Sequence, residues 1–383
     1  MSFLKISRSS IDKLYTCVLA LSLSLHIFNM GGGDSFKPFY VTALIAALIT
    51  FLFAPKTYTF RQLVAFLICV LISVIISMAV GVMKDFINLL IILLCCYGVS
   101  CINIDSLFKM LMFLIPIDLM ALLYEAVTNP IYRFQGFYND PNYLCTTLIV
   151  FFFICLMAYI RYEKKLIRIM ILADCVVIVV LIVFTLSRTG LACISLLLLS
   201  AFASSIKKHL LKVCFILMIS MVALFNYASE FIEQEYDLVY ERIFENRDNF
   251  ESAGELRSEL SKQNLRFIAD HPLFAFFGLG PSTTGGEVSK QIPGLAQYRK
   301  SDLRDHNTWT SCLSEYGLFA LFFMSVMIVE TVIYIKKENK SSSRYISFVF
   351  CFSMIIFSLS IWQMTYLPFW WGIFLLNNKQ LLN

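Results

Sequence analysis

Residues 166–205, which read LIRIMILADCVVIVVLIVFTLSRTGLACISLLLLSAFASS, decide the fold class of this chain. They contain two apolar runs, 166–186 and 189–205, each close to the length that a helix needs to cross a hydrocarbon core of about 30 Å. A short polar break, Ser187-Arg188-Thr189-Gly190, lies at the junction of the two runs. Because every backbone polar group must be satisfied within lipid, the stretch predicts two membrane-spanning helices joined at a membrane surface.

The same pattern recurs along the whole chain of 383 residues, of which 59% are hydrophobic and 15% are charged. Soluble domains carry roughly a quarter charged residues, so lipid rather than water is the predicted surrounding of this protein. We predict an all-α polytopic membrane protein of about twelve transmembrane helices. The apolar runs of helical length are 14–30, 38–54, 63–82, 86–102, 107–127, 142–160, 166–186, 189–205, 210–228, 309–335, 345–361 and 363–377.

Lys and Arg residues gather in every second loop between these runs, and basic loops face the cytoplasm. The pattern predicts an inner-membrane protein with both termini in the cytoplasm. It divides the chain into helices within 1–228, a large periplasmic loop at 229–307 and helices within 308–383. Apolar residues recur at helical spacing in the loop, which predicts helices along the membrane surface. The short outside loops hold only the single basic residues Lys37, Lys84, Arg133 and Arg188.

Several classes of protein are disfavoured by what the sequence lacks. The formal charge of +5 is spread over short loops, which argues against nucleic acid as a partner. The 12 cysteines include no Cys-x-x-Cys pair and lie mostly in apolar runs, so neither a disulfide framework nor a metal site is predicted. The chain also has no Asp-x-Asp, no Gly-x-x-x-x-Gly-Lys and no His-Glu-x-x-His motif. No metal or other cofactor is therefore expected, and nucleotide-sugar, ATP-dependent and zinc-protease chemistry are disfavoured.

Two polar segments place arginines on the predicted outer side. The guanidinium of Arg188 either reaches lipid phosphate as an ordinary interfacial side chain or holds a phosphate or pyrophosphate with paired donors. Arg257 and Arg266 lie on a predicted helix of the large loop, before Pro272 and Gly278-Leu279-Gly280. Each is either a solvated helix charge or a ligand contact, and the sequence leaves both interpretations open.

Two further polar segments adjoin predicted spans. Asp305-His306-Asn307 stands where the large loop re-enters the membrane, and Glu315-Tyr316-Gly317-Leu318 follows it. His306 is either a structural residue or a general base, because imidazole takes up a proton near neutral pH. The predicted outside loop 134–142 either caps the helix that follows it or binds a sugar. It reads Phe134-Gln135-Gly136-Phe137-Tyr138-Asn139-Asp140-Pro141-Asn142.

In their order and spacing these segments resemble the superfamily of O-antigen polymerases and O-antigen ligases, which are bacterial membrane glycosyltransferases. The resemblance covers mainly residues 185–320. It implies a GT-C-like helical fold and a reaction that needs neither a metal nor a nucleotide sugar. The motifs that carry it are Ser187-Arg188-Thr189-Gly190, Arg257 followed by Pro272 and Gly278-Leu279-Gly280, and His306-Asn307 followed by Glu315-Tyr316-Gly317-Leu318.

The resemblance also implies a substrate and residue roles. The donor is an oligosaccharide linked to undecaprenyl pyrophosphate; membrane lipids surround the enzyme, and a chain-length regulator is a candidate partner. By position, Arg188 and Arg257 match pyrophosphate-binding arginines, and His306 matches the catalytic loop histidine. Arg266 has no firm counterpart in the family. The remaining candidate substrate contacts are Arg266, Asn307, Asp140 and Asn142.

Polymerisation of lipid-linked repeat units is the favoured activity, because the aromatic lead-in to Asp140-Pro141-Asn142 looks more like the polymerase group. An O-antigen ligase differs in its acceptor, which is lipid A-core. A flippase or transporter has a similar number of spans, but the sequence shows no internal repeat, and a loop of about 80 residues is longer than a connection needs. A scaffold protein would need no outward cluster of Arg, His and Asn.

Overall fold

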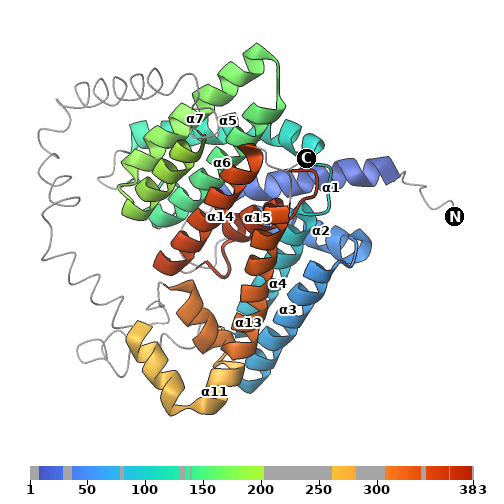
Figure 1. The fold of residues 1–383 in the computed structure, drawn as a ribbon, viewed down its shortest axis with the longest axis vertical. Coiled ribbons are helices and arrows are strands. Elements are labelled where there is room, and N and C mark those ends of the chain that lie inside the picture. The colour runs from blue at the N-terminus through green and yellow to red at the C-terminus, as the bar shows by residue number, and fades with distance from the viewer. Residues whose placement is uncertain are drawn as a thin grey trace, which may run out of the picture.

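The structure is a computed structural model that describes residues 8–28, 37–77, 82–129, 134–138, 140–201, 261–281, 307–337, 342–361 and 363–381. Every regular element within these ranges is helical (Figure 1). The helices are α1 (Arg8–Ser24) with the 3-10 turn η1 (Leu25–Phe28), α2 (Phe39–Phe53), α3 (Tyr58–Ser77), α4 (Val82–Val99), α5 (Ile104–Thr128), α6 (Pro141–Arg161), α7 (Lys165–Phe184), Arg188–Ala201, 261–270, α11 (Pro272–Phe277), α13 (Thr308–Lys337), α14 (Ser342–Ser360) and α15 (Leu367–Leu376).

Seven of the described helices are long and apolar enough to cross a membrane, by length and composition. The predicted all-helical membrane protein is thereby confirmed over the described residues, whereas the number of about twelve spans and the GT-C-like arrangement stay predictions. The predicted span 210–228 lies outside the described residues. The seven are Ser10–Phe28, Tyr58–Ser77, Ile104–Thr128, Pro141–Arg161, Lys165–Phe184, Thr308–Lys337 and Ser343–Ser360.

The helix predicted at 363–377 is shorter than a membrane span. α15 has 10 residues, so it rises about 15 Å, which is half of a hydrocarbon core. All of its residues are buried, including Trp370 and Trp371, and it packs against α4 and α6. A helix enclosed by protein and one enclosed by lipid have the same apolar composition, so hydropathy does not separate the two cases.

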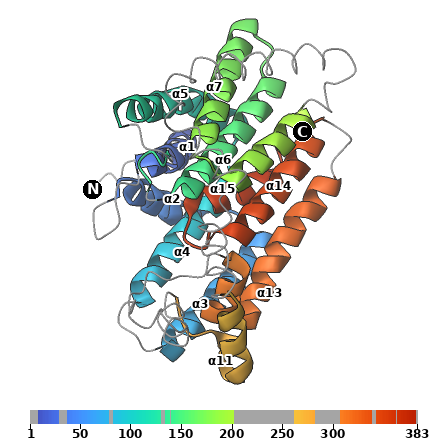
Figure 2. The same cartoon turned by 90° about the vertical axis from the view of Figure 1, so that its left-hand side faces the viewer.

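α6 is the central helix of the bundle (Figures 1 and 2). The side chains from Leu144 to Cys155 are all buried, and α7, α14 and α15 pack around them. A helix that is apolar on every side is enclosed either by protein or by lipid, and over this stretch protein encloses α6. The residues at the N-terminus of α6 are therefore held by several helices at once.

One end of the bundle brings together segments that are far apart in the sequence. Arg161 forms an ion pair with Asp105 at 3.2 Å and donates a hydrogen bond to the carbonyl oxygen of Leu381. Asn378 donates to the carbonyl oxygen of Val99 at 2.8 Å. All these segments are predicted to face the cytoplasm, so segments predicted to share a side lie at the same end. Which end faces the cytoplasm remains a prediction.

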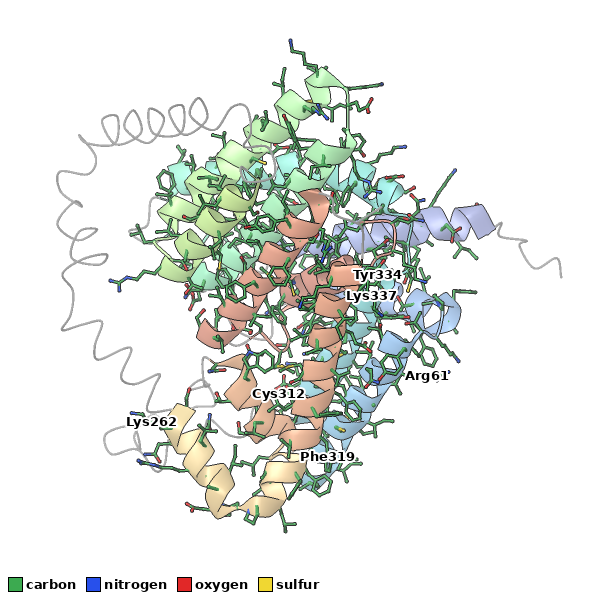
Figure 3. The ribbon with its side chains drawn as sticks, viewed as in Figure 1. Arg61, Lys262, Cys312, Phe319, Tyr334 and Lys337 are labelled. Atoms are coloured by element: carbon green, nitrogen blue, oxygen red, sulfur yellow. The ribbon has the colours of Figure 1, made fainter. Side chains whose placement is uncertain are left out.

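α13 is divided in two at Gly317, whose φ of 85° and ψ of 174° are not helical. The short first part, 308–316, turns sharply into the long second part, 318–337, which runs along α3 (Figures 1 and 2). Figure 3 places Phe319 near the break and Lys337 at the other end of the long part. The predicted re-entry of the loop therefore occurs through a short helix and a break, and the lipid-length part of α13 begins only after Gly317.

Candidate functional site

The N-terminus of α6 is the first element of the site. The Asp140 side chain caps the helix, because its Oδ1 accepts a hydrogen bond from the Asn142 backbone N–H at 2.7 Å, and Pro141 stands at the first helical position. The capping interpretation of this segment is therefore the one observed for Asp140. Asn142 has a different role, since its Oδ1 accepts a hydrogen bond from the Ser187 hydroxyl at 2.7 Å.

Ser187 joins the polar break after α7 to the start of α6. Its Oγ also accepts a hydrogen bond from the Gly190 N–H at 3.1 Å, which caps the helix Arg188–Ala201. A side chain at Gly190 would place its Cβ only 2.3 Å from the Cys145 sulfur, so glycine lets this helix approach α6 closely. Arg188 is exposed at the first turn of the helix. Arg188 thus follows directly after a residue that is hydrogen-bonded to the first turn of α6.

Asn307 and Thr308 form the second element, at the N-terminus of α13. Asn307 caps the helix, because its Oδ1 accepts hydrogen bonds from the backbone N–H groups of Trp309 at 2.9 Å and Thr310 at 3.4 Å. The buried Thr308 hydroxyl donates to the Ile361 carbonyl oxygen at 2.7 Å. The Thr308 hydroxyl therefore attaches this end of α13 to the turn that follows α14.

Gln363 connects the two elements. Its backbone N–H donates to the Thr308 hydroxyl at 2.9 Å, and its side-chain amide donates to the Thr146 hydroxyl at 3.1 Å. The Thr146 hydroxyl in turn donates to the Asn142 carbonyl oxygen at 3.0 Å. Since that hydroxyl proton is already used, Thr146 must accept from Gln363, which fixes the amide orientation. Hydrogen bonds thus connect Ser187 to the first turn of α6, and that turn through Gln363 to Thr308, which is the residue next to Asn307.

A second buried series of hydrogen bonds extends toward α1. The ring Nδ1 of His26 lies 3.0 Å from the Tyr138 hydroxyl, which lies 3.0 Å from the Thr147 hydroxyl. The Tyr366 hydroxyl lies 2.6 Å from Thr147 and donates to the Tyr143 carbonyl oxygen. Burial raises the pKa of Tyr138 above its ordinary value, so its hydroxyl stays neutral and serves as a hydrogen-bonding group.

The large loop meets α13 at the break. The backbone N–H groups of Leu279 and Gly280 donate to the carbonyl oxygens of Ser314 and Glu315 at 2.9 and 2.8 Å. The Gly278-Leu279-Gly280 motif therefore packs directly on Glu315-Tyr316-Gly317. In this way the end of the short helix 308–316 is held by the loop, and its beginning by Thr308.

The structure brings together most, but not all, of the predicted site residues. Asp140, Asn142, Arg188 and Asn307 surround or adjoin the hydrogen-bond series at the α6 N-terminus. Arg266 is exposed on the separate helix 261–270. His306 and Arg257 lie outside the described residues. Within the described part of the chain, no group of three or more His, Cys, Asp or Glu residues is arranged to hold a metal ion.

Sequence reasoning missed the connecting residues Thr146, Thr308, Gln363 and His26. Each is a polar side chain inside or beside an apolar run, and such residues usually face the interior of a bundle rather than lipid. That signal identifies them as buried, but it does not identify which ones meet. The partners are set by the packing of helices that are more than 200 residues apart, as for Thr146 and Gln363.

Replacing Thr308 by valine is expected to destabilise the protein, whereas replacing it by serine is not. Valine keeps the shape but removes the hydroxyl, which leaves the Ile361 carbonyl and the Gln363 N–H without this partner. Each buried group left unsatisfied costs about 1–3 kcal/mol of unfolding free energy. Thermal unfolding of the purified protein in detergent measures the effect. Equal unfolding midpoints for Thr308→Val and Thr308→Ser would contradict the role of the hydroxyl.

Residues 173–325 of the chain match the model of a protein family described as O-Antigen ligase. The matched region contains the Arg188 turn, the Gly278 motif and the start and break of α13. The match supports the resemblance to the superfamily of O-antigen ligases and polymerases, whose members are glycosyltransferase-like enzymes. It also suggests lipid-linked glycans as substrates. No curated protein matches the chain.

Proposed function

We propose, with this family match as the premise, that the chain polymerises oligosaccharide repeat units carried on undecaprenyl pyrophosphate into surface polysaccharide at the periplasmic side of the inner membrane. The observation that carries the proposal is the convergence of the Ser187-Arg188 turn, the α6 N-terminus and the Asn307 cap through one series of hydrogen bonds. These segments belong to three different parts of the sequence, and each presents polar groups at the same end of the bundle.

In the proposed reaction, an acceptor sugar hydroxyl attacks the anomeric carbon of the donor glycan. The new glycosidic bond forms as the bond from that carbon to undecaprenyl pyrophosphate breaks, and His306 takes the hydroxyl proton. Arg188 and Arg257 hold the departing pyrophosphate with paired N–H donors, which match phosphate oxygens better than a lysine does. No metal is needed in this scheme, because the arginines balance the charge that develops on the leaving group.

The α6 N-terminus supplies candidate glycan contacts. The side-chain Oδ1 of Asn142 already accepts a hydrogen bond from Ser187, so the side-chain N–H groups of Asn142 are the donors that it offers to a sugar. Asp140 contributes by holding the first turn of α6 in place. Arg266 and Asn307 complete the proposed set of substrate-binding residues, on the loop helix and at the start of α13.

A deletion strain tests the proposed activity against the ligase alternative. Both enzymes use the same class of donor and differ in the acceptor, which is a lipid-linked repeat unit for a polymerase and lipid A-core for a ligase. Surface glycan of the deletion strain is separated on a gel. Loss of the ladder with a single repeat retained on the core supports the polymerase, whereas loss of every capped core supports the ligase. Vesicles that flip lipid-linked sugars but never lengthen them would instead indicate a flippase.

Replacing Arg188 by lysine is expected to lose most glycan extension while the protein stays inserted in the membrane. Lysine keeps the charge but loses the planar pair of donors, and a bidentate contact with phosphate adds both energy and geometric specificity. Extension of lipid-linked oligosaccharide by purified protein measures the effect. Lys262→Ala, which alters an exposed cation elsewhere in the described loop, is the control. Wild-type activity of Arg188→Lys would remove the phosphate-binding role.

A further inference from the structure

α11 and the start of the long part of α13 share an exposed apolar surface. On α11, Leu273 is 76% exposed and Phe276 is also exposed. On α13, Leu318 and Phe319 are exposed, and Phe322 is 58% exposed. The rings of Phe276 and Phe319 lie with their centroids 6.0 Å apart, so the two helices contribute to one continuous surface, which we call the α11 patch.

The length of α13 sets the position of this patch relative to the membrane. The segment from Leu318 to Lys337 has the length of a single span, since 20 helical residues rise about 30 Å. It ends on Lys336 and Lys337, whose charged ends belong at a membrane surface. Its other end, at Leu318, therefore lies at the opposite surface, and α11 packs beside it and beside α3.

Lipid-facing side chains lead directly into the patch. α3, which packs against α11, exposes Ile72, Ile75 and Ile76 toward its C-terminal end. In contrast, the preceding helix 261–270 exposes mainly the polar residues Lys262, Arg266 and Asp270, and Leu265 is its only large apolar side chain that is exposed. Figure 3 shows Lys262 at the end of this helix that is far from Phe319 and from the long part of α13. The change from polar to apolar exposure occurs at His271-Pro272, where one helix ends and α11 begins.

We infer that α11 inserts into the interfacial layer of the membrane, with the α11 patch covered by phospholipid acyl chains of the leaflet at the break in α13. Leu273 and Phe276 extend the lipid-facing surface of α3 and α13 beyond the end of the spans. An exposed apolar surface of this kind, next to a polar helix, is typical of segments that lie in the membrane interface. The inference does not depend on the reaction that the protein catalyses.

The contacts of α11 give this insertion a consequence for the rest of the site. The residues that follow α11 donate backbone hydrogen bonds to Ser314 and Glu315, so α11 is attached rigidly to the end of the short helix 308–316. Asn307 stands at the other end of that short helix. Anchoring α11 in lipid therefore holds the start of α13 at a constant depth, near the membrane surface where lipid-linked molecules diffuse.

Spin labels at matched positions test the inference in phospholipid vesicles. Single cysteines replace Leu273, Asp270 or Val329 in a background in which alanine replaces the partly exposed Cys17, Cys69 and Cys101 and also Cys214. Collisions with oxygen report lipid, and collisions with a water-soluble nickel complex report water. The expected result is that the labels at 273 and 329 both favour oxygen several-fold, whereas the label at 270 favours nickel.

Two results would overturn the inference. A label at 273 that is as open to nickel as the label at 270 would show that water covers the patch. A label at 273 that is shielded from both reagents would show that protein covers it, either another segment of this chain or a second copy. The label at Val329 reports correct insertion in every sample, because Val329 is exposed in the middle of the long part of α13 and lies outside the α11 patch.

Discussion

Replacing His306 by alanine or glutamine is expected to reduce glycan extension by a factor of about 10² to 10⁴, the range that a positioned general base supplies. A sugar hydroxyl is a poor nucleophile at neutral pH, whereas undecaprenyl pyrophosphate is already a good leaving group. Activation is therefore needed at the acceptor. His306 lies outside the described residues, but Asn307 and Thr308 beside it are anchored at the junction of α6, α13 and the turn after α14.

The same pair of variants separates catalysis from a structural role. Extension is measured per folded molecule, and the amount of protein in the membrane is measured in parallel. Loss of extension at normal abundance supports the catalytic role, and low abundance in both variants supports the structural one. Thr308→Ser serves as the control, because it alters the adjacent residue and keeps its hydroxyl. Normal extension by His306→Ala and His306→Gln at normal abundance would exclude His306 as the base.

Replacing Gly317 by alanine is expected to disrupt the break in α13 and to lower both stability and activity. Its φ of 85° and ψ of 174° lie in a region that only glycine occupies readily, and a residue with a side chain there costs of order 1–3 kcal/mol. A Cβ at this position would also lie 2.2 Å from the Phe276 carbonyl oxygen. A backbone atom has little freedom to move away, so the clash adds to the conformational strain.

Gly278 lies on the other side of the same contact between α11 and α13, and a side chain there is disfavoured for the same two reasons. It has a φ of 76° and a ψ of 167°, and a Cβ there would lie 2.3 Å from the Glu315 carbonyl oxygen. The two glycines thus allow two backbones to meet where no side chain fits. Thermal unfolding and size-exclusion profiles of Gly317→Ala and Gly278→Ala measure the loss. Leu318→Ala, at an exposed neighbouring position, is the matched control. A wild-type unfolding midpoint for both glycine variants would contradict this account.

The polar motifs differ in how far they were predictable from the sequence. The Ser187-Arg188-Thr189-Gly190 break was recognisable because it interrupts two apolar runs, and a polar break between runs marks a membrane surface. Asp140-Pro141-Asn142 was recognisable as a helix start, because Asp and Pro have fixed preferences at the first positions. These are local signals. The hydrogen bond from Ser187 to Asn142 joins residues 45 positions apart, and no local signal contains it.

The sequence by itself determined that this chain is helical and lies in a membrane, because the length and apolar content of a run suffice to predict a helix in lipid. The run 309–335 predicted one continuous span, so neither the break at Gly317 nor its approach to Gly278 was predicted. Only the tertiary structure decided that the backbones around these two glycines meet, that Gln363 connects Thr146 to Thr308, and that α15 is a short buried helix. The physical reason is the same in each case. Apolar surface does not distinguish a protein neighbour from lipid, so the choice of neighbours is made by side-chain packing and by the pairing of buried polar groups.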